Sequence, residues 1–219
     1  MKPSLALLGI WCLAVVSGAV ISGHQPAERL AAPLERSRND VMLDVLGQSR
    51  TLLARYLWFK MDIFHEILDE QGVQVEKQVQ VLPLLRLVTL LDPTITDAYD
   101  IIAYDLVKGH GQVEQAIDIL DEGLDRDPTN TTLLMRKALI LVQRKRFAEA
   151  LAPAEKATAL VSDEFDILNA NRLLYWSAKG AKRTDLMRKA LDTLLAKRPD
   201  DPLWNNEKAV LERTTPSPP

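Results

Sequence analysis

An Asp-Pro pair recurs in a chain whose other residues favour helix, and it constrains the fold more than any other feature. Asp92-Pro93 interrupts LLDPTITDAY, and Asp127-Pro128 interrupts LDRDPTNTTLL. Pro128 follows Pro93 by 35 positions, and Pro199 follows Pro128 by 71, close to twice that interval. Proline restricts the residue before it and cannot continue a helical hydrogen-bond ladder. The interval therefore predicts helical units of about 34 residues, each ended by a turn.

Apolar and small residues keep the same interval. From Val41 onward, apolar residues recur at the three- and four-residue spacing of a helix. In every unit, the residues 12, 8 and 5 positions before the terminator are apolar or small, counting from Pro93, Pro128, Ser162 and Pro199. They are Val81, Ala116, Ala150 and Met187; Leu85, Leu120, Ala154 and Leu191; and Val88, Gly123, Ala157 and Leu194. An all-α chain of repeated helix pairs is therefore expected.

The segment TLLMRKALILVQRKRFAEALAPAEKATAL, residues 132–160, resembles the tetratricopeptide repeat (TPR) family. The family pattern is W-x2-L-G-x2-Y, then A-x3-F, then P. Ala138 stands in the first helix of the unit, and Phe147 and Ala150 stand in the second. The preceding unit matches from Tyr99 to Gly123, and looser units begin near residues 58 and 165. The resemblance implies a right-handed superhelical array of about four TPR-like helical hairpins.

The resemblance also implies a partner-binding groove, because ligands of the family usually lie against the first helix of each unit. The groove positions are Tyr56, Phe59, Ile63 and Glu66; Asp97, Asp100, Tyr104 and Val107; Thr132, Met135, Leu139 and Val142; and Asp166, Asn169, Leu173 and Trp176. This lining favours a helix or extended segment with apolar anchors and some Lys or Arg. The alternative is that these residues pack inside the chain, against a capping element or the N-terminal helix.

The N-terminal residues 5–23, LALLGIWCLAVVSGAVISG, carry no charge. At about 1.5 Å per residue, a helix of this length just crosses a hydrocarbon core of about 30 Å. Ala14, Gly18 and Ser22 form a stripe of small residues that would let membrane helices pack closely. Residues 1–23 are therefore interpreted as a single transmembrane helix or signal-anchor that contacts membrane lipid. The alternative is a signal peptide that is cleaved near its end.

The rest of the chain divides by composition. Residues 24–40 are polar and are expected to form a tether. Residues 41–213 form the predicted repeat domain, which ends in a capping helix whose Trp204, Val210 and Leu211 cover the last apolar face. Residues 214–219 are expected to be a disordered tail. The short segment before the anchor places the repeat domain on the far side of the inner membrane, in the periplasm or another extracytoplasmic space.

Composition and motifs argue against several classes of function. The net charge is -3 and no basic stripe indicates nucleic acid. The single cysteine, Cys12, allows neither an internal disulfide nor a cysteine-based metal site. No P-loop, G-x-G-x-x-G, G-x-S-x-G or H-E-x-x-H pattern is present. Asp62, His65, Glu66 and Asp69 share helical faces, in a pattern more typical of a polar surface than of a metal site. No enzyme activity, cofactor or metal is expected.

Two functions fit these features. The first is a non-catalytic, membrane-anchored TPR scaffold or adaptor. It would be an accessory subunit of a larger membrane or envelope assembly, with integral membrane proteins of a multi-subunit complex as partners. The alternative is a secreted or periplasmic TPR binding module with a cleaved signal peptide.

Overall fold

The described part of the chain is entirely helical. The computed structural model describes residue 47, residues 49–70 and residues 81–214, without the side chains of residues 62 and 64–70. Every regular element within these ranges is an α-helix. The helices are α3 (Ser49–Glu70), α4 (Val81–Leu91), α5 (Thr96–Lys108), α6 (Val113–Arg126), α7 (Thr131–Gln143), α8 (Phe147–Leu160), α9 (Glu164–Gly180), α10 (Thr184–Lys197) and α11 (Pro202–Thr214).

This arrangement confirms the all-α prediction for the described residues. The predicted membrane helix of residues 1–23, with Ala14, Gly18 and Ser22, lies outside them, as do the tether of residues 24–40 and most of the predicted tail. Within the ranges that the structure describes, no helix is both long and apolar enough to cross a membrane.

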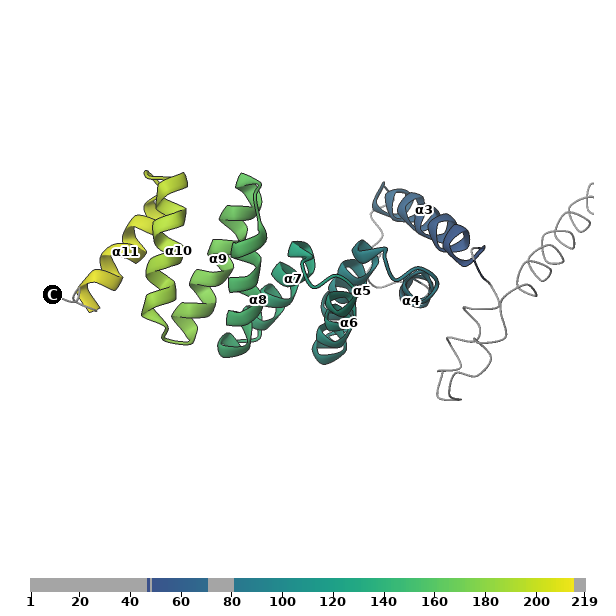
Figure 1. The fold of residues 1–219 in the computed structure, drawn as a ribbon, viewed down its shortest axis with the longest axis horizontal. Coiled ribbons are helices and arrows are strands. Elements are labelled where there is room, and N and C mark those ends of the chain that lie inside the picture. The colour runs from purple at the N-terminus through teal and green to yellow at the C-terminus, as the bar shows by residue number, and fades with distance from the viewer. Residues whose placement is uncertain (1–46, 48, 71–80, 215–219) are drawn as a thin grey trace, which may run out of the picture.

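Helices that follow one another pack as hairpins: α3 with α4, α5 with α6, α7 with α8, and α9 with α10. The hairpins stack in chain order, so that α3 lies at one end of the array and α11 at the other (Figure 1). The first helices also contact each other across hairpins, α5 with α7 and α7 with α9. The helices are joined by short turns and contact their neighbours in the chain. This is the repeat architecture predicted from the interval between the prolines.

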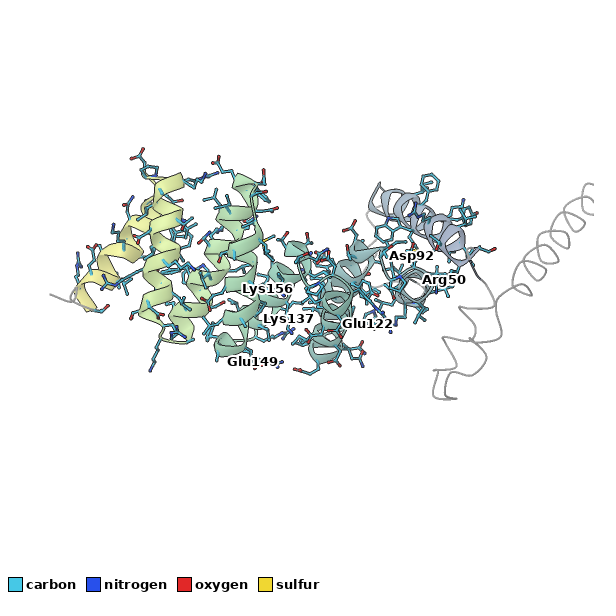
Figure 2. The ribbon with its side chains drawn as sticks, in the orientation of Figure 1. Arg50, Asp92, Glu122, Lys137, Glu149 and Lys156 are labelled. Carbon is cyan, nitrogen blue, oxygen red and sulfur yellow. The ribbon has the colours of Figure 1, made fainter. Side chains whose placement is uncertain are left out.

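Ion pairs tie the second hairpin to its neighbours on both sides. Arg86 of α4 lies 2.7 Å from Glu122 of α6, and Lys137 of α7 pairs with Asp121 of α6. Figure 2 shows Glu122 and Lys137 close to the junction of the second and third hairpins. Each partly exposed pair of this kind contributes about 0–1 kcal/mol. These pairs therefore fix the relative placement of the hairpins more than they stabilise them.

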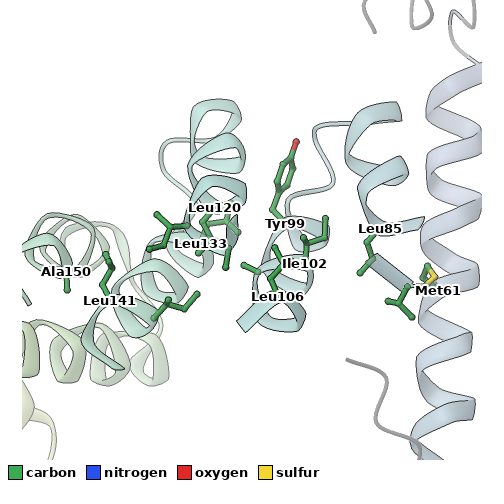
Figure 3. Close-up of a cluster of buried hydrophobic side chains, with 14 residues drawn as sticks. Met61, Leu85, Tyr99, Ile102, Leu106, Leu120, Leu133, Leu141 and Ala150 are labelled. Carbon is green, nitrogen blue, oxygen red and sulfur yellow. The ribbon is translucent and has the colours of Figure 1, made fainter. Parts of the chain in front are cut away.

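The hydrophobic core runs along the stack instead of forming one central cluster. One cluster extends from Met61 of α3 to Ala150 of α8 (Figure 3). A second extends from Ala138 of α7 to Leu211 of α11. Both clusters include residues of the third hairpin, α7 and α8, so the two clusters adjoin there and together extend along the described array. This is the packing expected when each repeat contacts only its neighbours.

Small residues allow the helices to approach closely at two points. A methyl carbon added at Gly123 would lie 2.8 Å from Leu133 Cδ1 and 3.0 Å from the ring of Tyr99. A methyl carbon added at Gly180, the last residue of α9, would lie 2.1–2.4 Å from three ring carbons of Phe147. Phe147 begins α8, so its ring is seated directly on the backbone of the following helix. Glycine is required at both positions by the space available.

The Asp-Pro-Thr sequences form two identical turns between hairpins. Oδ1 of Asp92 accepts hydrogen bonds from the backbone N–H and the hydroxyl of Thr94, at 3.1 and 2.6 Å. Oδ1 of Asp127 accepts the same pair from Thr129, at 3.0 and 2.8 Å. Such Asx turns replace the backbone hydrogen bonds that the helix can no longer make. The turns therefore stop the first and second hairpins at the same place.

The start of α7 follows one of these turns and is fixed by Asn130. The Asn130 side chain accepts a hydrogen bond from the Leu133 N–H at 3.1 Å, as an N-cap residue does. Its Nδ2 donates to Thr96 Oγ1 at 3.1 Å, which links the starts of α5 and α7. Asn130 thus places two first helices side by side.

The predicted capping helix is α11, with one correction. Trp204 and Leu211 are buried against α9 and α10, whereas Val210 is 43% exposed. Leu211 lies two helical turns from Trp204 and shares its face, but Val210 is rotated away from that face. Glu207 takes part in the contact instead, because it bonds both Lys179 and Tyr175 of α9.

We expect Gly180→Ala to destabilise the protein. Alanine normally stabilises a helix relative to glycine by about 1 kcal/mol, but the overlap with Phe147 should lower the free energy of unfolding by about 1–3 kcal/mol. Urea denaturation followed by circular dichroism measures this change. In a Phe147→Leu background the same substitution should do less damage, because the ring that causes the overlap is gone. A stability gain for Gly180→Ala alone would contradict the close contact.

The Glu207 contact should make the C-terminal end of the array sensitive to acid. Burial raises the pKa of Glu207, but hydrogen bonds from Lys179 and Tyr175 outweigh it and leave the pKa below 4.5. The stabilisation is therefore complete above about pH 4.5 and is lost as the pH falls through the lower folded-state pKa. Urea denaturation should show a smaller loss of stability for Glu207→Gln than for the wild type between neutral pH and about pH 3. Glu212→Gln, at an exposed position of α11, should behave like the wild type. Equal losses in all three would show that Glu207 does not govern this end.

Candidate functional site

The first helices of three consecutive hairpins, α5, α7 and α9, bring equivalent positions into rows. Met135 follows Asp100 by 35 positions and precedes Asn169 by 34. Because these helices lie side by side, side chains at the same position of each unit project from the same surface. Residues one repeat apart in the sequence therefore lie next to each other on one surface.

A hollow of about 500 Å³ lies on this surface between α5, α7 and α9, and we call it the α7–α9 hollow. It is lined by Asp100, Thr132, Met135, Arg136, Leu139, Phe165, Asp166, Asn169, Arg172, Leu173 and Trp176. Its volume falls within the range of about 300–1,000 Å³ that is typical of ligand sites. Its lining combines apolar walls with a few polar groups, as such sites usually do.

The apolar part of the hollow is contributed mainly by α7 and α9. Met135, Leu139, Leu173 and Trp176 are partly buried, so that each keeps one side toward the hollow. Phe165, at the start of α9, is 70% exposed. Large apolar side chains left open in a row are a common mark of a surface that another molecule covers.

A second cavity of about 260 Å³ continues from the hollow toward the C-terminal end. The two cavities share Phe165, Asn169 and Arg172, and the second reaches Leu203 and Trp204 of α11. Together they form a track that runs across α7, α9 and α11. A track of this kind suits an elongated ligand better than a compact one.

One ion pair closes the α5 side of the hollow. Arg136 donates two hydrogen bonds to the carboxylate of Asp100, from Nε at 2.6 Å and from the terminal nitrogen at 2.8 Å. The bonds to Asp100 raise the pKa of Arg136, against the opposing effect of burial. The guanidinium also lies 5.4 Å from the ring centroid of Tyr104. This two-point contact, strong among ion pairs, holds α5 and α7 at a fixed distance.

The opposite wall is rigid because its aromatic residue is part of a stack. The Trp176 ring lies 5.2 Å from the ring of Tyr175 and 6.2 Å from that of Trp204, between centroids. The ammonium group of Lys179 lies 5.0 Å from the Trp176 ring, a cation–π distance. Trp204 belongs to the capping helix, so the cap also fixes the geometry of the hollow.

The structure brings together only some of the positions that the sequence predicted. Asp100, Met135, Leu139, Asn169, Leu173 and Trp176 all line the α7–α9 hollow, with Thr132 and Asp166. Tyr104 adjoins it through Arg136, whereas Asp97 is exposed beyond it. Tyr56, Phe59 and Ile63 are on α3, at the far end of the array (Figure 1). The hollow therefore collects predicted positions of α5, α7 and α9, and the predicted positions of α3 lie outside it.

Three further residues line the hollow and were not predicted, namely Arg136, Phe165 and Arg172. Arg136 lies one position beyond a predicted groove residue, and a positive charge one repeat after Asp100 was a signal for a bond between neighbouring units. Arg172 occupies a position where the family pattern has a small residue. We find no signal in the sequence for Phe165.

The hollow offers surface for binding and few groups for chemistry. Its ionisable residues are Asp100, Arg136, Asp166 and Arg172, and the first two neutralise each other. Over the side chains that the structure describes, no group of three or more His, Cys, Asp or Glu is placed to hold a metal ion. The side chains of His65, Glu66 and Asp69 lie outside that description. The lining can cover an apolar surface of a ligand and can orient that ligand with a few polar contacts.

Comparison with known proteins shows the fold. No protein-family model and no curated protein sequence matches the chain. A solved structure described as "MamA RS-1 ArsTM double mutant" superposes with a TM-score of 0.58 at 16% identity, covering 77% of this chain and 86% of that one. The first TPR domain of the human RPAP3 protein gives 0.46 at 21% identity, covering 55% of this chain and 92% of that one. A thermophilic TPR protein of Thermus thermophilus gives 0.48 at 17% identity, covering 75% and 97%. The chain has a TPR-like fold, and at these identities the likeness is one of fold alone.

We expect Arg136→Ala to lower the free energy of unfolding by about 2 kcal/mol, because it leaves the buried side of Asp100 without its partner. Arg136→Lys should recover only part of this loss, since lysine cannot make the two parallel bonds. Thermal and urea denaturation measure both variants. Arg172→Ala is the matched control, because Arg172 is exposed and forms no ion pair with another described residue. Equal effects at the two arginines would contradict the role assigned to the pair.

Proposed function

We propose that this protein is a non-catalytic adaptor that binds an apolar segment of a partner protein in the α7–α9 hollow. The observation that carries the proposal is the row of half-buried apolar side chains, Met135, Leu139, Leu173 and Trp176, held open between two rigid walls. One wall is fixed by the pair of Arg136 and Asp100, and the other by the aromatic stack. A rigid and preformed apolar surface loses little entropy when it binds, which favours recognition over random association.

The shape and charge of the lining indicate the kind of segment. The track across α7, α9 and α11 fits a helix or an extended peptide that inserts apolar anchors. The carboxylates alone led us to expect a ligand with Lys or Arg. In the structure Asp100 is already satisfied by Arg136, and Arg172 adds a positive charge near Asp166. The lining therefore has no strong charge preference, and the proposed segment is mainly apolar.

The uncharged residues 5–23 support a chain anchored in the inner membrane through lipid contacts, with the repeat domain on the extracytoplasmic side. We propose that the protein is an accessory subunit of a multi-subunit assembly whose other members are integral membrane proteins. A secreted binding module with a cleaved signal remains the second hypothesis, and the intact mass of the mature protein separates the two.

Leu139→Asp tests the hollow. Leu139 lines it, is partly exposed, and is not among the residues packed against the described core clusters. We expect the substituted protein to fold but to lose at least about tenfold in partner affinity, because a carboxylate would be buried without a partner. The measurement is quantitative mass spectrometry of proteins retained by the full chain after mild detergent extraction of its native membrane.

Leu160→Asp is the matched control, since Leu160 is 40% exposed on α8 and lies outside the hollow. The proposal requires a set of proteins retained by the wild type and by Leu160→Asp but reduced with Leu139→Asp. If both variants retain the same proteins as the wild type, the hollow is not the binding surface. If hydroxyl-radical footprinting shows the side chains of Met135 and Trp176 shielded from oxidation in the isolated full chain, the chain fills its own groove and the proposal is overturned.

A further inference from the structure

The outer face of α3 carries a stripe of large apolar residues that no described element covers. Leu52, Tyr56 and Phe59 are 73%, 56% and 60% exposed, and Ile63 continues their line. Positions four, three and four apart fall on one side of a helix. The opposite side of α3 is buried, through Ala54 and through Met61, which packs against α4. The stripe therefore points directly away from the array.

Positive charge is concentrated on the same part of α3. Residues 49–61, the first part of α3, include Arg50, Arg55 and Lys60 and contain no Asp or Glu. The four acidic residues of the helix all lie in its second part, at Asp62, Glu66, Asp69 and Glu70. Helical geometry places Arg55 on one side of the apolar stripe and Lys60 on the other. Both are exposed, and none of the three cations forms an ion pair with another described residue. Figure 2 shows Arg50 on α3, at the end of the array opposite to α11.

We propose that this face of α3 docks on the surface of an anionic lipid bilayer. Leu52, Tyr56 and Phe59 would enter the boundary between headgroups and acyl chains, and Arg55 and Lys60 would contact anionic headgroups. Amphipathic helices that lie in the membrane interface combine these two features, an aromatic and aliphatic face with flanking basic residues. The proposal rests on the proposed membrane location of the chain, because only residues 24–48 separate α3 from the apolar residues 5–23.

Charge distinguishes the bilayer from the other occupants of this face. In a parallel pair of α3 helices packed face to face, Arg55 and Lys60 of one copy would lie close to the same cations of the other. An antiparallel pair would bring them toward the acidic second half of the partner's α3, so a second copy is kept as an outcome of the experiment below. The apolar residues 5–23 of this chain contain no carboxylate to pair with the basic residues. An anionic lipid surface satisfies both the apolar stripe and the cations, and each basic residue near such a surface strengthens binding about fivefold.

The experiment places an environment-sensitive fluorophore on the stripe, through Phe59→Cys in a Cys12→Ser background of the full chain. The chain is reconstituted with vesicles of phosphatidylcholine, with or without phosphatidylglycerol. We expect the emission to shift to the blue only when phosphatidylglycerol is present, and the shift to weaken in high salt. The same fluorophore at Phe165→Cys, on α9, should not shift. Flotation of the vesicles reports separately whether the chain is attached to them.

Arg55→Glu with Lys60→Glu should lower the ratio of docked to undocked chain in vesicles that contain phosphatidylglycerol, read from the fluorophore, by at least about tenfold. Arg144→Glu with Lys156→Glu changes the net charge equally at exposed sites elsewhere and should leave this ratio unchanged.

An equal shift on pure phosphatidylcholine, or no shift at all, would overturn the proposal. A shift that occurs without vesicles would also overturn it. If that shift depends on protein concentration, the face binds a second copy of the chain; if it is independent of concentration, the face binds the chain's own N-terminal residues. Flotation without a shift would overturn only the docking of α3, whereas loss of flotation would overturn the proposed membrane anchor.

Discussion

Every hairpin of this protein can bury its apolar face only against the next hairpin, and the rest of the structure follows from that constraint. The contact of Tyr99 and Leu133 over Gly123 shows how it is met, because the first helices of two units and the second helix between them meet at one small residue. Such a contact recurs only if every unit has the same length. The Asp-Pro-Thr turns supply that constant length at two junctions, by stopping α4 and α6 with the same hydrogen bonds.

The same constraint explains where a binding surface can form. A helix in the array buries the side that faces its hairpin partner and the next hairpin. The first helices also have one side that borders only other first helices. On that side α5, α7 and α9 leave the α7–α9 hollow between them. Arg136 and Asp100 keep the helices from closing over it, and the stack of Trp176 with Tyr175 and Trp204 keeps its other wall in place. The hollow therefore has a defined shape.

The fold could be predicted from the sequence because its signals are local and repeated. Proline turns, small residues and the N-cap at Asn130 each act within a few residues. The small residues and a side-chain N-cap, at Asp163, return in the next unit, where Ser162 takes the place of the proline. The site was predictable only where the units keep a common length. The first unit carries several extra residues before Val81, and the predicted row of Tyr56, Phe59 and Ile63 does not continue into the hollow. Contacts between units, such as that of Arg136 with Asp100, depend on the relative placement of two helices, which no single unit encodes.

The two ends of the described array differ, and the difference bears on what a membrane partner could offer. At the C-terminal end α11 buries Trp204 and closes the stack, whereas α3 presents an open aromatic face flanked by cations. Helices pack about 10 Å apart, so α9, three hairpins from α3, lies on the order of 30 Å from that face. If α3 rests on the bilayer, the hollow is held well beyond the headgroups. A partner that is itself embedded in the membrane would then have to reach the hollow with a loop, a tail or a soluble domain, and its membrane helices would remain out of reach.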